Sequence, residues 1–200
     1  MEEAIRYLLD KDPVFVKIVE TFGVPTIPRR PQGFSTLLLL ILEQQVSIDS
    51  AKAAFVKLQS KIKNFVPQEF LELSDEDFRS AGVSRQKTGY IKGLAAAVIN
   101  NELNLDSLPF KSSEEVREEL IKRKGIGNWT IDVYLMFALE APDIFPIGDI
   151  AVVNTMKELW NFETREQMRS HAENWTPYKS YATYLLWHHY LRKRNRTVVY

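Results

Sequence analysis

The 200-residue sequence contains no cysteine, and its formal net charge is zero. The absence of cysteine excludes disulfides, thiol catalysis, iron–sulfur clusters and cysteine-ligated zinc. Because Lys+Arg and Asp+Glu number 26 each, no global field marks the protein as a binder of nucleic acid or membranes. Apolar runs such as Leu37–Leu42 are far too short to cross a bilayer. The segment MEEAIRYLLDKDP lacks the basic and apolar regions of a signal peptide, so we expect a soluble protein of the cytoplasm or nucleus.

Glycine is also scarce, with 8 residues, whereas hydrophobic residues make up 45% of the chain. A chain of this length and composition can bury one sizeable core, or two smaller ones in separate lobes. Apolar or small residues recur every three or four positions between Phe34 and Asn64, which is the spacing of a helical stripe. No segment shows the alternation that is typical of strands. The sequence therefore predicts an all-α fold of about ten short helices.

Capping residues and prolines indicate where these helices begin and end. Two helices should meet at residues 44–47, where polar residues interrupt the apolar stripe. Ser74 with Asp77, and Ser112 or Ser113 with acidic residues behind it, have the pattern of helix N-caps. Further helices are expected at residues 86–101, from the cap at 112 or 113 to about 123, and at 128–140, 150–160, 163–173 and 177–192, with a loop at 105–109.

The most distinctive local motif is a tight turn with Gly125 and Gly127 between two expected helices. Glycines allow a ligand to approach the backbone closely, and the N–H groups at a helix N-terminus bind anions such as phosphate. The adjacent Lys122, Arg123 and Lys124 would attract a nucleic-acid backbone. The alternative is an ordinary corner between two helices that uses glycine as a C-cap.

Asp149 follows a loop at residues 142–148 and occupies the N-cap position of a predicted helix. Aspartate is a favoured N-cap, so this position needs no catalytic explanation. The alternative is that the carboxylate stabilises positive charge developing at a ribose C1′ and orients an attacking water. Asp132 and Glu140 on the preceding helix, and Asp143 beside a proline, compete for this role. We prefer Asp149 among the four.

Aromatic and amide side chains could contact a nucleotide. Most aromatic residues after residue 128 should pack in the core, but Trp129 and Trp187 are the ones we expect beside a stacked base. A cationic base would gain a cation–π contribution of about 0.5–2 kcal/mol there. Gln44 and Gln45 could be buried and hydrogen-bonded, or one of them could fill the space left by an extruded nucleotide. The three histidines lack the spacing and companion carboxylates of a zinc site.

Five segments together resemble the helix-hairpin-helix (HhH-GPD) DNA glycosylase superfamily, and within it most closely the 3-methyladenine DNA glycosylase II branch. They occur in the family's order and cover most of the chain from about Phe34 to Trp187. The segments are LLLLILEQQVSIDSAKAAF, AGVSRQKTGYIKGLA, LIKRKGIGNWTIDVYL, PDIFPIGDIAV and WTPYKSYATYLLW.

The resemblance implies a two-lobed helical fold with the active-site cleft between the lobes. One lobe would combine residues 1–33 and 110–200, with the N- and C-terminal helices packed together. The other would span residues 34–109, and the hairpin motif would occupy residues 114–140. The bacterial branch commonly carries a β-rich domain at its N-terminus, for which the 33 residues before Phe34 leave no room.

The resemblance also implies roles for individual residues, beginning with Asp149 as the catalytic aspartate. The hairpin turn, residues 121–127, would clamp a phosphate. The implied base-binding residues are Trp129, Trp187, Tyr134 and Tyr181. The implied DNA-binding residues are Gln44 or Gln45 as a wedge entering the duplex, Ser47, Lys122, Lys124, Gly125, Gly127, Asn128 and Thr130. No cofactor or side-chain metal site is implied beyond a sodium or potassium ion on the backbone carbonyls of Ile121, Arg123 and Ile126.

Two positions bear on the type of enzyme. Bifunctional family members carry a Schiff-base lysine two positions after the second hairpin glycine, where this sequence has Trp129, so the resemblance implies no lyase activity. An aromatic residue expected four positions beyond that tryptophan is replaced by Val133, with Tyr134 adjacent, which is a departure in the base pocket.

The expected function is therefore a monofunctional DNA glycosylase that releases alkylated purines such as 3-methyladenine or 7-methylguanine from duplex DNA in base excision repair. The alternative is a non-catalytic helix-hairpin-helix protein that recognises DNA structure. Both hypotheses predict salt-sensitive DNA binding that weakens when Lys122 and Lys124 are replaced. We expect a monomer whose partner is double-stranded DNA with a damaged base and not a membrane. It would lie in the nucleoid of a bacterium or archaeon, or in the nucleus of a eukaryote.

Overall fold

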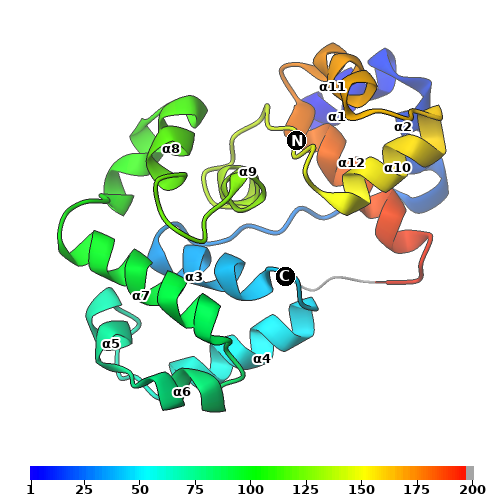
Figure 1. Cartoon of the computed structure of the whole chain (residues 1–200). Coiled ribbons are helices and arrows are strands. Elements are labelled where there is room, and N and C mark those ends of the chain that lie inside the picture. Colours follow the sequence, from blue (N-terminus) through cyan, green and yellow to red (C-terminus); the bar gives the residue numbers. More distant parts are fainter. Residues whose placement is uncertain (197–200) are drawn as a thin grey trace. The chain divides into compact units, whose positions relative to one another are not determined.

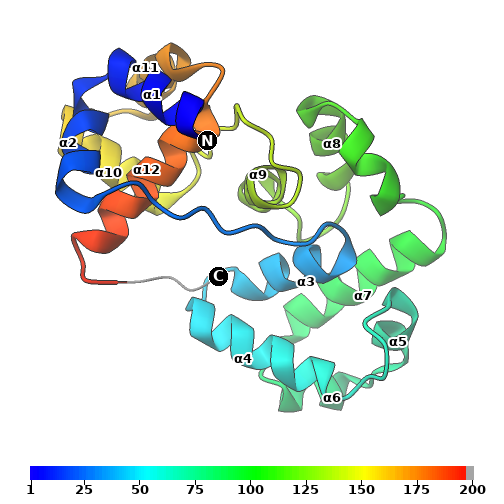
Figure 2. The same ribbon diagram turned by 180° about the vertical axis from the view of Figure 1, so that it is seen from behind.

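The computed structural model describes residues 1–196, and these form two compact units. The terminal unit contains residues 1–29 and 135–196, and the central unit contains Arg30–Tyr134. Among the described residues, every regular element is a helix, with twelve α-helices and two short 3-10 helices (Figures 1 and 2). The prediction of an all-α fold is therefore confirmed. No helix within residues 1–196 has both the length and the apolar character needed to cross a membrane.

The terminal unit is built from both ends of the chain. It contains α1 (Glu2–Lys11), α2 (Pro13–Phe22), α10 (Ile150–Trp160), α11 (Arg165–Ala172), the 3-10 helix η2 (Glu173–Trp175) and α12 (Lys179–Arg192). In Figure 1, α1 and α2 in blue lie beside α12 in orange and red, and α12 packs on α1, α2 and α10. The core includes the fully buried side chains of Leu8, Phe15, Met156, Trp175 and Leu185.

The central unit contains the remaining helices. They are α3 (Phe34–Glu43), α4 (Ile48–Gln59), α5 (Pro67–Glu72), α6 (Asp75–Ser80), α7 (Arg85–Ile99), the 3-10 helix η1 (Leu105–Phe110), α8 (Ser113–Leu120) and the first part of α9 (Asn128–Phe137). The helix α7 packs against α3, α5 and α6 (Figure 2). Leu37, Ile41, Phe70 and Ile91 are fully buried in this unit, so the apolar stripe of α3 and α7 forms its core.

The division between the units differs from the one implied by the family resemblance. Residues 110–134 were assigned to the lobe with the chain ends, but they lie in the central unit. Hydrogen bonds explain the difference, because they tie the hairpin to elements of that unit. The Gln44 amide donates to the Gly125 carbonyl at 2.8 Å, and the Arg123 guanidinium donates to Glu102 at 3.0 Å. Such long-range pairing between polar side chains is not visible in a hydrophobic pattern.

Most predicted caps are present, while three helix assignments differ. Ser74 and Ser112 both form capping boxes, with Asp77 and Glu115 respectively. The expected loop at residues 105–109 is the 3-10 helix η1, since two leucines three positions apart are buried there. The helix α8 ends at Leu120 rather than near residue 123, and α9 ends at Phe137 rather than at residue 140. Residue 140 adopts a left-handed conformation (φ 54°), which cannot continue a right-handed helix.

A buried ion pair anchors the start of the central unit to α3. The Arg30 guanidinium donates to both carboxylate oxygens of Glu43, at 3.0 and 2.9 Å. The two side chains are only 8% and 9% exposed. Paired N–H···O bonds of this kind satisfy the charges that burial would otherwise leave without partners.

Candidate functional site

Asp149 begins α10 as the sequence predicts, and its carboxylate is held by three donors. Its Oδ1 atom accepts hydrogen bonds from the backbone N–H of Ala151 at 2.8 Å and of Val152 at 3.1 Å. The indole Nε1–H of Trp187, 38 residues later on α12, donates to the same oxygen at 3.1 Å. The N-cap interpretation is therefore confirmed, and the third bond connects the cap to an aromatic side chain that we expect beside a base. This combination fixes the orientation of a half-buried carboxylate.

The competing carboxylates have other partners. Asp132 is 6% exposed and forms an ion pair with Arg117, and its burial raises its pKa although the guanidinium acts in the opposite direction. Glu140 is exposed and pairs with Arg29 at 2.8 Å. Asp143 accepts a hydrogen bond from the backbone N–H at the start of α12 at 3.1 Å. Asp149 differs from these three in that its carboxylate accepts a hydrogen bond from an aromatic side chain, the indole of Trp187.

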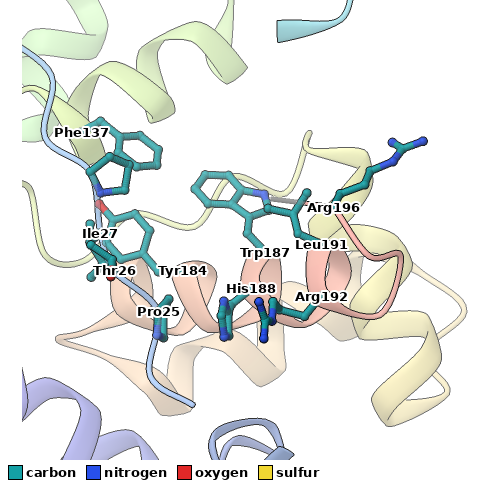
Figure 3. Close-up of a pocket in the computed structure, with 11 residues that line it drawn as sticks. Pro25, Thr26, Ile27, Phe137, Tyr184, Trp187, His188, Leu191, Arg192 and Arg196 are labelled. Carbon is teal, nitrogen blue, oxygen red and sulfur yellow. The ribbon is translucent and has the colours of Figure 1, made fainter. Parts of the chain in front are cut away.

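Trp187 lines a pocket of about 230 Å³ within the terminal unit (Figure 3). The ring of Phe137 is stacked against the indole, with centroids 5.6 Å apart and an interplanar angle of 15°. Figure 3 shows Tyr184 and Leu191 projecting from α12 with Trp187, and the segment 25–27 lies along the opposite wall. The pocket therefore combines aromatic side chains of α9 and α12 with residues of the segment 25–28.

Sequence reasoning did not single out Phe137, Tyr184 or Pro25 as pocket residues. Phe137 and Tyr184 belong to aromatic sets that we assigned mostly to the core, and both are indeed buried. A useful signal was present in α12, where aromatic residues recur every three positions at 178, 181, 184 and 187. Side chains at this spacing share one helix face, and neighbouring tyrosine rings meet edge to face at 5.9 Å. Tyr181 on this face is half-buried and lines a second pocket, of about 490 Å³.

The expectation that Tyr134 contacts the base is wrong in this structure. Its ring is fully buried, and its hydroxyl accepts a hydrogen bond from the backbone N–H of Gly33 at 2.9 Å. Burial also raises the pKa of this hydroxyl. Tyr134 therefore holds the start of α3 against α9 and offers no face on which a base could stack. Trp129 is half-buried in the central unit, and its role as a base contact stays a prediction.

The two glycines of the hairpin turn do different things. Gly125 has φ +90°, and a Cβ atom added there would collide with the ring of Tyr90 on α7. Gly127 has no atom within 4 Å of the position that its Cβ would occupy. The corner interpretation therefore explains Gly125, while the space around Gly127 remains available for a ligand. Lys122, Lys124 and Asn128 around the turn are exposed.

Replacing Gly125 with alanine should therefore destabilise the protein, whereas Gly127→Ala should not. We expect Gly125→Ala to lower the free energy of unfolding by about 2–4 kcal/mol, through backbone strain and the clash with Tyr90. Urea denaturation followed by circular dichroism measures both variants. Similar losses for both glycines would contradict this division of roles.

The glutamines at the end of α3 also separate into two roles. The Gln44 amide donates to the carbonyl of Gly125 and to the hydroxyl of Thr130, at 2.8 and 3.1 Å. Gln45 is exposed and has a left-handed backbone, with φ 57°. The hydroxyl of Thr130 is buried against Gln44, so the expectation that this side chain contacts DNA is wrong. Ser47 is exposed and caps α4 through the N–H of Ser50, and its role in DNA binding stays a prediction.

A family comparison agrees with this geometry. The model of the HhH-GPD superfamily of base excision DNA repair proteins matches residues 38–178, which include the hairpin, Asp149 and most of the helices of both units. The chain belongs to the HhH-GPD superfamily. YfjP of Bacillus subtilis is 30% identical over 165 residues, which span 77% of this chain and 58% of the length of that protein.

Solved structures of HhH-GPD proteins have the same fold over nearly the whole chain. The DNA-3-methyladenine glycosidase of Bacillus halodurans matches with a TM-score of 0.83 and 28% identity, covering 96% of this chain and 91% of that one. The 3-methyladenine DNA glycosylase Mag1 of Schizosaccharomyces pombe, in complex with abasic DNA, has a TM-score of 0.83 and 26% identity, with coverages of 92% and 95%.

The structure brings some of the expected HhH-GPD site residues together and leaves others in separate units. Asp149, Trp187 and Tyr181 lie in the terminal unit, while the hairpin, Trp129 and both glutamines lie in the central unit.

Each of the three histidines is hydrogen-bonded within the terminal unit. The rings of His171, His188 and His189 bond to Asp12, to the backbone carbonyl of Phe22 and to Glu158 respectively. Within residues 1–196, no group of three His, Cys, Asp or Glu side chains could hold a metal ion.

Proposed function

We propose that the protein is a monofunctional DNA glycosylase that hydrolyses the N-glycosidic bond of alkylated purines in duplex DNA, as the first step of base excision repair. The observation that carries the proposal is the hydrogen bond from the Trp187 indole to Asp149 at 3.1 Å. It places a carboxylate next to an aromatic pocket, which are the two parts that this reaction needs. The names of the relatives support the substrate class, since two similar solved proteins are a 3-methyladenine glycosidase and a 3-methyladenine glycosylase.

The chemistry suits a site with one oriented carboxylate. Alkylation of a ring nitrogen makes a purine cationic, so the base leaves as a neutral molecule without protonation by a strong acid. As the bond from C1′ to nitrogen breaks, the sugar develops positive charge, which the carboxylate of Asp149 stabilises. Water then bonds to C1′ and loses a proton to the solvent, which carries away the positive charge of the alkylated nucleotide, and the products are a neutral free base and an abasic site. The task of the protein is to extrude, stack and hold the nucleotide while this happens.

The aromatic pocket supplies the stacking surface. We place the extruded base against Trp187, whose indole contacts the rings of Phe137 and Tyr184 and lines the same pocket as they do. An electron-rich indole attracts a cationic base by a cation–π interaction of about 0.5–2 kcal/mol. The same attraction is absent for a neutral undamaged purine, so the pocket favours alkylated bases by charge.

The central unit supplies the proposed contacts with the duplex. The exposed Lys122 and Lys124 and the open backbone at Gly127 form the phosphate clamp. Gln45 is the wedge, because it is exposed whereas the amide of Gln44 is engaged within the unit. Direct attraction to phosphates explains how a chain with no net charge can bind DNA.

A monovalent cation at the hairpin fits the chemistry of the turn. Sodium and potassium prefer neutral oxygen donors, and the proposed ligands are the carbonyls of Ile121, Arg123 and Ile126. The Arg123 carbonyl accepts one hydrogen bond, from the Ile126 N–H at 3.0 Å, which uses only one of its two lone pairs. Such an ion would add positive charge beside a bound phosphate.

Three further proposals complete the proposed function. The protein has no lyase activity, since Trp129 takes the position of the Schiff-base lysine. It is a monomer, and it is located with the genomic DNA in the nucleoid or nucleus.

Base release from a panel of duplexes tests the proposal. Each duplex carries one 3-methyladenine, 7-methylguanine, hypoxanthine or ethenoadenine, and the products are resolved as free base and abasic strand. We expect release of the methylated purines, with strand cleavage only after alkali because no lyase acts. Salt-sensitive duplex binding without release of any base would contradict the proposal and favour the alternative, a non-catalytic protein that recognises DNA structure.

A further inference from the structure

We infer that Gln44 is a positioning residue that joins the wedge Gln45 to the glycine hairpin, so that phosphate binding and base extrusion depend on one rigid element of the central unit. The inference rests on the proposed function of the protein. It assigns to Gln44 a role that differs from the wedge itself, and it includes Lys87 and Tyr90 of α7 as supports.

The first link runs from α3 to the hairpin through the side chain of Gln44. Its amide nitrogen has two hydrogens, and it donates to the Gly125 carbonyl and to the Thr130 hydroxyl. These partners lie 81 and 86 residues away in the sequence, one in the turn and the other in the first turn of α9. A single side chain therefore crosslinks the end of α3 to the glycine turn and to the helix that follows it, the two elements on either side of the proposed phosphate clamp.

The second link holds the backbone from which Gln45 projects. The Lys87 ammonium group donates to the carbonyls of Leu42 and Gln44, both at 2.7 Å. These are carbonyls at the C-terminal end of α3, which have no partner within the helix and attract a cation. Both the side chain and the carbonyl of Gln44 are thus fixed, and the direction of the next residue is fixed with them.

The third link shows that α7 supports the wedge and the clamp together. Tyr90 lies three positions after Lys87, on the same face of the helix. Its ring fills the space beside Gly125, where a Cβ atom would collide with it. Lys87 therefore holds the end of α3, from which the wedge Gln45 projects, while Tyr90 holds the turn at Gly125, which lies next to the proposed phosphate clamp. Movement of one against the other would break contacts on α7 as well as the bonds of Gln44.

This arrangement has a consequence for base extrusion. A wedge held at a set position relative to a bound phosphate enters the duplex at a set base step. Without the crosslink, the hairpin would still bind the backbone, but the wedge would explore many positions and extrusion would become rare. Loss of the Gln44 amide should therefore reduce extrusion and base release far more than it reduces DNA binding.

The test is a double-mutant cycle between Gln44 and Gln45. Gln44→Met removes the amide without adding charge, and Gln44→Glu keeps the shape but cannot donate. For each variant, we expect the single-turnover rate of base release to fall about 10- to 100-fold. We expect a similar fall in the equilibrium constant for extrusion, which is measured by the fluorescence of 2-aminopurine beside the lesion. In the Gln45→Ala background, no wedge remains to be positioned. There the same substitutions should lower the rate of base release and the extrusion equilibrium by less than about twofold.

A matched control and two contradicting outcomes make the test decisive. Gln59→Glu changes an exposed glutamine at the far end of α4 in the same unit and should alter none of these signals. Equal losses in the presence and absence of the wedge would overturn the inference, as would losses that merely follow the fraction of unfolded protein. If the wild-type protein extrudes 2-aminopurine but releases no damaged base, the proposed function fails while the coupling is still judged from the fluorescence.

Discussion

Asp149→Asn should lower the single-turnover rate of base release by about 10²–10³, because loss of the charge removes about 3–4 kcal/mol of transition-state stabilisation. Asparagine is as good an N-cap as aspartate, and its Oδ1 atom can accept the same bonds from Ala151, Val152 and Trp187. The substitution therefore removes the negative charge and leaves the local structure in place. For this reason the affinity for duplex DNA should change little.

The measurement is release of 3-methyladenine or 7-methylguanine under enzyme excess, with the dissociation constant for an abasic duplex measured in parallel. Asp143→Asn is the matched control, since Asp143 also accepts a backbone N–H at the start of a helix of the same unit. That variant should retain nearly full activity. Wild-type rates for Asp149→Asn would show that another group stabilises the sugar and would remove the central role assigned to this carboxylate.

Glu43→Ala should lower the free energy of unfolding by about 3–5 kcal/mol, because it leaves the buried guanidinium of Arg30 without its counter-charge. The pair is bidentate, and its side chains are 8% and 9% exposed. Glu43 is also the last residue of α3, directly before the two glutamines. We therefore expect destabilisation of the central unit around the element that carries the proposed wedge.

Urea denaturation monitored by tryptophan fluorescence and circular dichroism measures this effect. The control is Glu76→Ala, which breaks an exposed pair with Arg79 and should cost less than about 1 kcal/mol. Replacing Arg30 and Glu43 together by methionine should recover most of the loss, since no uncompensated charge then remains in the interior. A small effect of Glu43→Ala alone would mean that water reaches Arg30 readily after the substitution.

The sequence was a good guide to features set by neighbouring residues. A hydroxyl or carboxylate side chain at an N-cap bonds to N–H groups two or three residues away, so Ser74, Ser112 and Asp149 could be assigned as caps from local order alone. Helix periodicity likewise depends on spacing within a segment. The helix ends were less accurate, because they depend on backbone conformations such as the left-handed residue 140.

The sequence did not predict which aromatic residues are buried in the core and which line a pocket. Composition and spacing could not separate Tyr134, which is fully buried and bonded to Gly33, from Tyr181, which lines a pocket. Both are tyrosines within helices of the second half of the chain, and the difference arises from what packs against each helix. The assignment of residues 110–134 to the chain ends failed for a similar reason, because side-chain hydrogen bonds to Gln44, directly after α3, and to Glu102, in the loop after α7, decide where the hairpin belongs.

The sequence by itself determined the all-α class, the family and the position of the carboxylate at the head of α10, because each depends on short segments whose interactions are local. Only the tertiary structure decided which residues meet across long separations. It joined Trp187 to Asp149, and it separated Gln44, bonded inside the central unit, from the exposed Gln45. The physical reason is that such contacts depend on how distant helices pack, and adjacent glutamines carry the same chemical groups until packing gives each a different environment.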